Sequence, residues 1–271
     1  MKRETRGGKP RLRIILGVCC LLLVCVSAYM VISQLVREKR DEEAFQALID
    51  QIGQAEPTAT PGPAAPAGSP PPQAEPTPSG FHKYDVLYEQ NHDLFGWVSI
   101  DGTKLNYPVM HTPDDPEHYL RRAFDGTRSV SGVPFLDGSC YEGCGNYIVY
   151  GHHMKNGAMF TAITDYADES FWRKHPVIRF DTLDGAGEYE VLAAFYSKAY
   201  EVTDKTAFRY YNYTDLTDEA VFDEYLSHIR DAALYDTGVT AEYGDQLLTL
   251  STCSYHTTDG RFVVVAKRNP A

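Results

Sequence analysis

The chain contains little cysteine relative to its length. It has 271 residues and six cysteines, three of which lie inside a long apolar run near the N-terminus. The other three are Cys140, Cys144 and Cys253. Three cysteines cannot form the disulfide framework of a small secreted domain, so the fold must depend on a hydrophobic core.

Positive charge is also scarce, and several common motifs are missing. The chain has 25 Lys and Arg against 37 Asp and Glu, a net charge of -12 and a pI of 5.2. These values argue against nucleic acid or anionic lipid as a partner of the folded part. There is no internal repeat, no glycine-rich phosphate loop and no HExxH motif, so nucleotide chemistry is unsupported and no cofactor is expected. Asp114, Asp115 and Glu117 are interpreted as solvated turn charge, and no metal site is expected.

Long apolar runs occur once. Residues 14–36 are uncharged over 23 positions, which is enough for a helix to cross a bilayer. Residues 1–13 are basic and lack a clear cleavage site, so we expect an uncleaved anchor with a cytoplasmic tail. The rest of the chain would then lie outside the cell, as the extracellular part of a single-pass cell membrane protein.

The composition changes twice after the apolar run. Residues 37–54 have helical spacing of apolar residues and predict a juxtamembrane helix. Residues 55–80 are rich in Pro, Ala and Thr and predict an extended extracellular linker. Residues 81–271 form the one folded domain.

This domain is predicted to be mainly β. Short strand-like segments separated by Gly, Asp, Asn and Pro favour a closed or nearly closed β architecture. The segments are GWVSI, NYPVMH, VPFLD, NYIVYGH, VIRFD, YEVLAAFYS, QLLTLSTC and RFVVVAKR. Helices are expected at 84–91, 162–175 and 218–234, the last with Thr217 or Asp218 as its cap.

The segment CYEGC at 140–144 allows several interpretations. It could close a small local disulfide or hold a metal with help from elsewhere. We expect two surface-loop cysteines, either free or joined to each other, since no CxxC pair or second cluster occurs. Whether Cys140 and Cys144 pair is left open.

TLSTC at 249–253 places a cysteine at the end of a predicted strand. A thiol attacks as its thiolate and needs a base or a cationic neighbour. His152 and His153 follow another predicted strand, where Gly151 would let the chain turn. Arg261 opens the last strand, and a hairpin would bring it beside Cys253. Singly, these are ordinary residues: a buried thiol, a packed histidine and a solvated edge arginine.

Together these motifs resemble the sortases, and among them class B. The resemblance rests on GWVSIDGTKLNYPVM, HYLRRAFDGTRSVSGVPFLD, NYIVYGHHMKNGAMF, DTGV at 236–239 and LLTLSTCSYHTTDGRFVVVAKR, which occur in family order. It implies the closed eight-stranded sortase β-barrel, with an N-terminal helix and a long helix before the last strand pair.

The resemblance also implies a cysteine transpeptidase. Cys253 would attack the Thr carbonyl of an LPxTG-like or NPxTN-like sorting signal and form a thioacyl enzyme. His152 would protonate the leaving amine, and Arg261 would hold the substrate backbone and the oxyanion. The partners would be surface proteins that carry the signal and an amine of peptidoglycan or of a pilin. The choice of His152 over His153 follows the position of the motif.

Substrate contacts are expected from two places. Ser251 shares a strand face with Cys253, and Thr252 is its neighbour. Tyr210 and Tyr211 belong to the long loop between the sixth and seventh strands, which walls the peptide groove in this family. Ser254 departs from members that have an acidic residue after the cysteine.

Two other functions are considered. An L,D-type cell-wall transpeptidase would need its histidine and cysteine close together in sequence, and here about a hundred residues separate them. A non-catalytic anchored wall-binding or pilus-associated barrel would merely bury Cys253. The exact sorting motif and the acceptor amine do not follow from the sequence.

Overall fold

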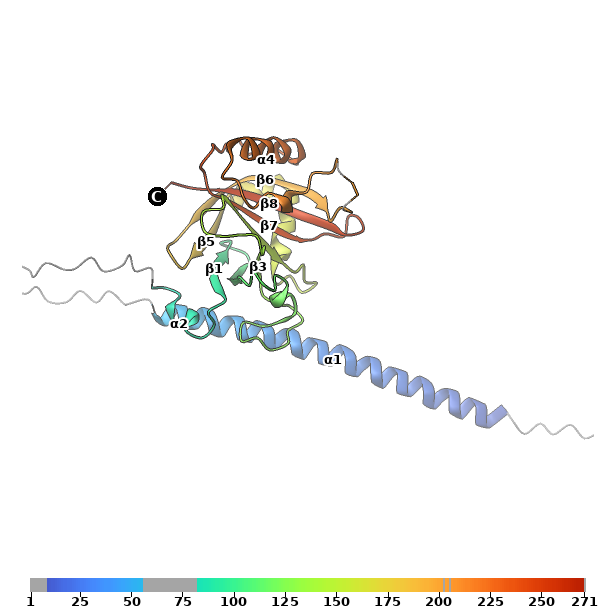
Figure 1. Ribbon diagram of the computed structural model, residues 1–271. Helices are drawn as coiled ribbons and strands as arrows, with labels where there is room; N and C mark the ends of the chain where they lie inside the picture. Colours follow the sequence, from blue (N-terminus) through green and yellow to red (C-terminus); the bar gives the residue numbers. More distant parts are fainter. Residues whose placement is uncertain (1–8, 56–81, 202, 205, 271) are drawn as a thin grey trace, which may run out of the picture. The chain divides into compact units, whose positions relative to one another are not determined.

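Eight strands close into a barrel in the computed structural model, which describes residues 9–55, 82–201, 203–204 and 206–270 (Figure 1). The strands are β1 (Leu94–Ser99), β2 (Asn106–Met110), β3 (Phe135–Leu136), β4 (Asn146–Gly151), β5 (Val177–Thr182), β6 (Glu188–Lys198), β7 (Leu247–Cys253) and β8 (Gly260–Arg268). Their order around the barrel is β1-β2-β3-β4-β7-β8-β6-β5. The predicted closed barrel of eight strands is confirmed. Nearly all of the predicted linker, and the first eight residues of the basic tail, lie outside the described residues.

Two of the strand pairs are parallel. β2 pairs with β3 and β4 with β7 in this way, while the other pairs are antiparallel. Because parallel strands end at the same edge of a sheet, β4 and β7 present their last residues side by side. β8 then returns from that edge as the antiparallel partner of β7.

The helical segments are fewer and mostly short. They are α1 (Lys9–Ala55), α2 (Asp85–Tyr88), η1 (His118–Arg121), η2 (Phe160–Ala167), α3 (Glu169–Lys174), η3 (Tyr210–Asn212) and α4 (Glu219–Ala232), where η marks a 3-10 helix. α4 packs against β6, and η2 packs against β7 and β8. Covered in this way, β8 can be apolar on both faces, and the run from Phe262 to Ala266 is fully buried.

The long helix before the last strand pair is α4, as expected. Its N-cap is Asp218, whose carboxylate accepts hydrogen bonds from the backbone N–H groups of Ala220 and Val221. This cap satisfies donors that the first helical turn leaves without a partner. The buried side chains recur at helical spacing and are Phe222, Tyr225, Leu226 and Ile229.

The helix expected across 162–175 is not continuous, and that prediction is wrong. Asp168 has extended backbone angles and separates η2 from α3. Its carboxylate accepts a hydrogen bond from the N–H of Ser170, so it acts as the N-cap of the second helix. An Asp in the middle of a helical pattern favours this local bond over helix continuation.

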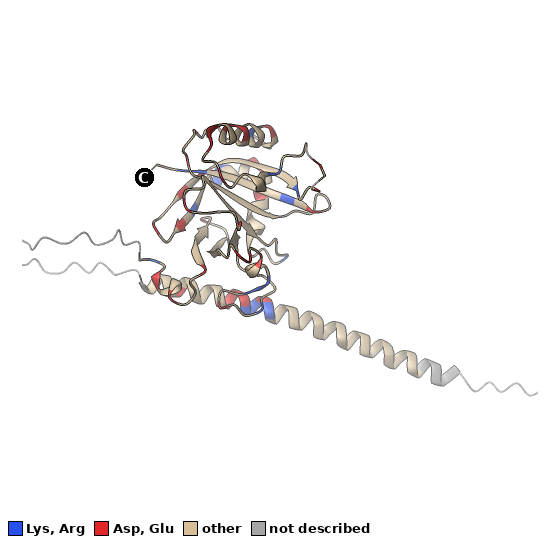
Figure 2. Cartoon of the chain, viewed as in Figure 1, with Lys and Arg blue, Asp and Glu red and all other residues tan. Residues whose placement is uncertain are grey.

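α1 contributes to two compact units, Met1–Ala44 and Phe45–Ala271. In the first unit, the apolar stretch is exposed and carries no charged residue (Figure 2). Within the described residues one helix, Ile14–Gln54, is long and apolar enough to cross a membrane, and its apolar 18-residue window has a mean hydropathy of 2.8. In the second unit, Phe45, Leu48 and Ile52 are buried, and the Phe45 ring lies 5.0 Å from that of Tyr107.

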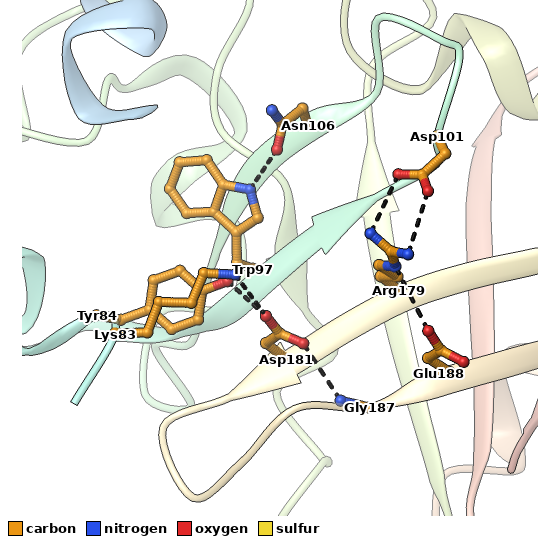
Figure 3. A network of polar contacts seen from close by, with 9 residues as sticks. All are labelled: Lys83, Tyr84, Trp97, Asp101, Asn106, Arg179, Asp181, Gly187 and Glu188. Atoms are coloured by element: carbon orange, nitrogen blue, oxygen red, sulfur yellow. Dashed lines mark hydrogen bonds and ion pairs between the residues drawn. The ribbon is translucent and has the colours of Figure 1, made fainter. Parts of the chain in front are cut away.

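A buried carboxylate holds the chain that leads into β1. Asp181 on β5 accepts hydrogen bonds from the Tyr84 hydroxyl at 2.7 Å and the Gly187 N–H at 3.2 Å (Figure 3). It also pairs with the Lys83 ammonium at 3.2 Å. The Tyr84 ring stacks on Trp97 with centroids 5.8 Å apart. These contacts compensate the cost of burying the charge and attach the entry segment to the barrel.

Candidate functional site

The predicted nucleophile and its partners lie at adjacent strand ends. β4 and β7 run in parallel with Gly151 paired to Thr252, so His152 and Cys253 are the next residues along the two neighbouring strands. Cys253 is in turn paired with Arg261 across the antiparallel β7 and β8. Adjacent strands are about 4.8 Å apart, so the fold brings together three residues that are distant in sequence.

A cavity of about 530 Å³ opens at this edge of the barrel. It is lined by His152, Cys253 and Arg261, and also by the four predicted substrate contacts Ser251, Thr252, Tyr210 and Tyr211. All seven predicted site residues therefore border one space. Its size is in the range of natural ligand pockets.

Cys253 is the last residue of β7 and is partly exposed. Its neighbours in the strand, Ser251 and Thr252, are buried. The thiol thus lies where the strand reaches the cavity, and a reagent or substrate can approach it. This combination of a fixed backbone and an accessible sulfur is what a nucleophilic cysteine requires.

His152 is held by a backbone carbonyl. Its Nε2 lies 2.9 Å from the carbonyl oxygen of Leu120, which can only accept, so Nε2 carries a proton. Burial lowers the pKa of His152, and the nearby Arg121 charge acts in the same direction, while the bond to Leu120 opposes them. The neutral ring is therefore favoured near pH 7, with Nδ1 as the nitrogen that can accept a proton.

His153 is placed differently from His152. Its Nδ1 donates to the backbone carbonyl of Cys253 at 3.1 Å, and its ring lies 5.3 Å from that of Tyr255. It does not line the cavity. The two adjacent histidines thus point to different sides, as strand alternation predicts, and His152 is the one that faces the cavity.

Gly151 is needed for a reason that the sequence did not reveal. We expected it to let the chain turn, but it is the last residue of β4 and does not have a positive φ. A Cβ atom there would lie 2.5 Å from the ring of Phe160. The backbone of Phe160 also donates to the carbonyl of His152 at 2.9 Å. η2 thus packs on the strand end that presents His152.

Arg261 is the second residue of β8, and its guanidinium is bound to the adjacent turn. Nη1 donates to the carbonyls of Asp259 at 3.2 Å and Gly260 at 3.1 Å. The positive charge of Arg261 also stabilises the ionised form of Tyr210, although burial dominates and raises the pKa of that phenol to about 12. Arg261 is thus the cationic group of the cavity wall on the side of the β6–β7 loop.

The predicted groove residues fall into two classes. The Tyr210 hydroxyl and the Ser251 hydroxyl are both buried and hydrogen-bonded at 2.6 Å, so β7 and η3 are joined. Thr252 donates to the Gly151 carbonyl at 2.7 Å, which joins β7 to β4. The Tyr211 hydroxyl accepts from the N–H of Tyr200 at 3.2 Å. These hydroxyls shape the wall through contacts within the protein.

Sequence reasoning missed the opposite wall. It is formed by residues of the loops around η1 and β3 and by β4, namely Pro116, Glu117, Leu120, Phe135, Asp137, Gly138 and Tyr150. Tyr150 donates to the Asp137 carboxylate at 2.9 Å. Glu117 is exposed, as expected for turn charge, yet it borders the cavity. The sequence signal that could have pointed to this wall is the segment HYLRR, because the Leu120 carbonyl within it accepts a hydrogen bond from His152.

The cysteines at 140 and 144 are not on the surface, and that expectation is wrong. Cys140 is 3% exposed and Cys144 is 0% exposed, and both are free thiols. The turn between them folds their side chains under the loop, against the start of β4. Among the residues that the structure describes, no group of three or more His, Cys, Asp or Glu is placed to hold a metal ion.

Comparisons with known proteins point to one family. A family model described as "Sortase domain" matches residues 98–269. The curated sortase B of Staphylococcus aureus (strain NCTC 8325 / PS 47) is 32% identical over 189 residues, which cover 68% of this chain and 74% of that protein. Sortase B of Listeria monocytogenes is 29% identical over 188 residues, 67% of this chain and 72% of that protein.

Solved structures agree with this result. Sortase B from B. anthracis in complex with AAEK1 has a TM-score of 0.59 at 31% identity, over 70% of this chain and 85% of that one. A Staphylococcus aureus sortase B-substrate complex has a TM-score of 0.69 at 24% identity, over 87% of this chain and 99% of that one. The second likeness supports the fold.

Proposed function

The chain belongs to the sortase family, class B, and is a cysteine transpeptidase; on this premise we propose that it cleaves an LPxTG-like or NPxTN-like sorting signal after its Thr and transfers the protein to an amine. The observation that carries the proposal is the shared cavity of Cys253, His152 and Arg261 at adjacent strand ends.

The first half of the reaction is acylation of Cys253. The Cys253 sulfur attacks the Thr carbonyl carbon, and its proton passes to the neutral His152 ring at Nδ1. The tetrahedral intermediate then expels the amine of the next residue, which takes that proton from His152. A thioester to Cys253 and a free peptide amine are the products.

Arg261 has the chemistry to stabilise the intermediate. Its guanidinium is permanently charged and offers five N–H donors in one plane, which suits a substrate carbonyl or a developing oxyanion. The two backbone carbonyls that it contacts hold its stem near the turn and use one of its nitrogens, Nη1. Other donors remain to meet substrate oxygen in the cavity.

The second half releases the enzyme. An amine of a peptidoglycan peptide or of a pilin enters the cavity, loses a proton to His152 and attacks the thioester. The new amide forms as the Cys253 sulfur leaves and regains a proton. The Tyr210, Tyr211, Ser251 and Thr252 side of the cavity would hold the sorting signal in both halves.

We also propose the placement of the enzyme in the cell. The exposed apolar part of α1 is the candidate membrane anchor, residues 1–13 form the cytoplasmic tail, 37–54 the juxtamembrane helix and 55–80 the spacer. The domain of residues 81–271 would then work outside the cell, attached to this single membrane-spanning helix. An extracellular location agrees with substrates at the cell surface.

A panel of sorting-signal peptides tests this function. The full-length protein in detergent is incubated with each peptide and an amine acceptor, and the products are identified by mass spectrometry. We expect cleavage after Thr, a transfer product, and loss of both when Cys253 is labelled with a methanethiosulfonate or changed by Cys253→Ala. Full activity of Cys253→Ala would exclude Cys253 as the nucleophile.

Because the chain is a cysteine transpeptidase, the non-catalytic wall-binding or pilus-associated barrel is no longer needed as an alternative.

A further inference from the structure

The loop between β3 and β4 buries two thiols that the proposed reaction does not use. The sulfur of Cys140 lies 3.6 Å and that of Cys144 3.4 Å from the backbone carbonyl oxygen of Asn146. Because both sulfurs lie within 3.6 Å of the same oxygen, the distance between them cannot exceed about twice that value. The two buried thiols therefore contact the same backbone carbonyl beneath the loop.

The backbone of the loop is folded so that the two cysteines converge. The N–H of Cys140 donates to the Asp137 carbonyl at 3.0 Å, and the N–H of Cys144 to the Tyr141 carbonyl at 3.1 Å. Gly143 has a φ of +81°, which a residue with a side chain rarely adopts. This turn directs the chain back, so Cys144 returns toward Cys140.

The thiols also interact with each other. The neighbouring thiol is the largest influence on the pKa of each group: it lowers the pKa of Cys144 and raises the pKa of Cys140. Cys144 is therefore the sulfur that more readily becomes a thiolate, and the Cys140 thiol is its neighbour. A thiolate next to a second thiol is the arrangement from which disulfides form by exchange.

We propose that Cys140 and Cys144 are joined by a disulfide in the mature enzyme, a modification that restrains the loop beside the active site. The inference rests on the placement of the barrel outside the cytoplasm, where disulfides form and persist.

The oxidation needs a disulfide oxidant, such as an extracytoplasmic thiol-disulfide oxidoreductase or a small-molecule disulfide. The Cys144 thiolate attacks one sulfur of the oxidant and displaces the other as a thiolate, forming a mixed disulfide. Cys140 loses its proton and attacks the Cys144 sulfur, displacing the second thiolate. The cysteines together lose two electrons and two protons, and the oxidant gains them. Because the pair is buried, this exchange would occur as the chain folds.

The bridge would leave the nucleophile untouched. The N–H of Ile148 donates to the Cys140 sulfur at 3.4 Å, and Ile148 is paired with Thr249 on β7. Cys253 is four residues further along β7, about 13 Å away at the usual rise of a strand. The pair therefore lies near one end of β7 and the nucleophile at the other.

The bridge would act on the cavity through the start of the loop. Asp137 and Gly138 line the cavity, and Asp137 is bound by the hydroxyl of Tyr150. A bridge two residues beyond Gly138 would limit how far this wall can open. Since the closed loop is short, the gain in thermal stability should be modest, about 4–8 °C in Tm.

Peptide mapping tests the bridge directly. The full-length protein is taken from membranes, quenched in acid, unfolded and treated with iodoacetamide without reductant. Trypsin releases both cysteines in one peptide, residues 129–155, and cleavage after Glu142 separates them. We expect no label on Cys140 or Cys144 and two fragments that stay linked until a reductant is added. One label on Cys253, in a different tryptic peptide, is the internal control.

Labelling of both Cys140 and Cys144 without reductant would overturn the proposal. Reductant should lower the Tm of the wild type and not that of the Cys140→Ser/Cys144→Ser variant, whereas equal shifts would contradict it. Peptide cleavage by the same preparation tests the proposed function separately. Labelling of Cys253 by a membrane-impermeant thiol reagent on intact cells tests the location separately as well.

Discussion

Cys253, the last residue of β7, is paired directly with Arg261 near the start of β8 in the antiparallel register of the barrel. Paired residues on adjacent strands project to the same face, so the sulfur and the base of the arginine side chain start from neighbouring positions. The turn that joins the strands therefore creates half of the proposed active site. The other half, His152, directly follows β4, which lies on the opposite side of β7.

Replacing Arg261 by Lys should reveal whether the planar guanidinium matters. The charge is kept, but the fork of donors is lost, so we expect acylation to slow by about 100- to 1000-fold, as for loss of an oxyanion donor. Single-turnover cleavage of a sorting-signal peptide measures this step. Arg179→Lys, at an exposed surface ion pair, is a matched control. A near-normal rate for Arg261→Lys would make Arg261 a structural residue.

The two adjacent histidines offer a sharp comparison. His152→Gln keeps a donor for the Leu120 carbonyl but removes the proton acceptor, and should lower kcat/KM by about 100- to 10,000-fold. His153→Gln can still donate to the Cys253 carbonyl and should retain most of the activity. Peptide cleavage assays on both variants decide the matter. The reverse order of the two losses would assign the base to His153.

The bond between Tyr210 and Ser251 should matter for stability as well as for substrate. Tyr210→Phe leaves the buried Ser251 hydroxyl without its partner, at a cost of about 1–3 kcal/mol in the free energy of unfolding. Tyr211→Phe, whose hydroxyl accepts from a backbone N–H in a half-buried place, should cost less. A double-mutant cycle with Ser251→Ala, followed by urea denaturation, should give a coupling of about 0.5–3 kcal/mol. No coupling would mean that the two hydroxyls do not act as a pair.

Stability should fall when the pH drops through the ordinary range of histidine. Burial lowers the pKa of His152 and of His111 below 6.5, so the unfolded chain binds more protons than the folded one at mildly acid pH. The free energy of unfolding is then largest above pH 6.5 and decreases below it. His152→Gln should reduce this decrease between pH 7.5 and 5.5, measured by denaturant titration. An unchanged slope would show that His152 does not titrate below its usual range.

Gly151→Ala tests how the histidine strand is supported. The added Cβ would meet the Phe160 ring at 2.5 Å, so β4 or η2 must shift and move His152. We expect lower kcat with little change in the binding of the thiol reagent to Cys253. Gly185→Ala, where a Cβ has open space, is the control. Normal activity of Gly151→Ala would show that the strand end tolerates the displacement.

Local sequence patterns were enough to predict the fold class, the start of α4 and the candidate site residues. The alternation and turn signals between residues 94 and 268 determined a closed β architecture, because each strand carries its own apolar positions and stop residues. Asp218 specified the start of α4 by the same local chemistry. The order of TLSTC, the glycine-histidine pair and Arg261 was enough to nominate the nucleophile, base and cation.

Only the tertiary structure decided what depends on distant partners. The parallel pairing of β4 with β7 puts His152 beside Cys253, and the Leu120 carbonyl, about thirty residues earlier, fixes the proton on its ring. The opposite cavity wall and the burial of Cys140 and Cys144 also arise from packing between separate segments. The local sequence around a residue predicts the strand or turn to which it belongs. Its burial and hydrogen bonds, in contrast, depend on distant segments that come into contact only when the barrel closes.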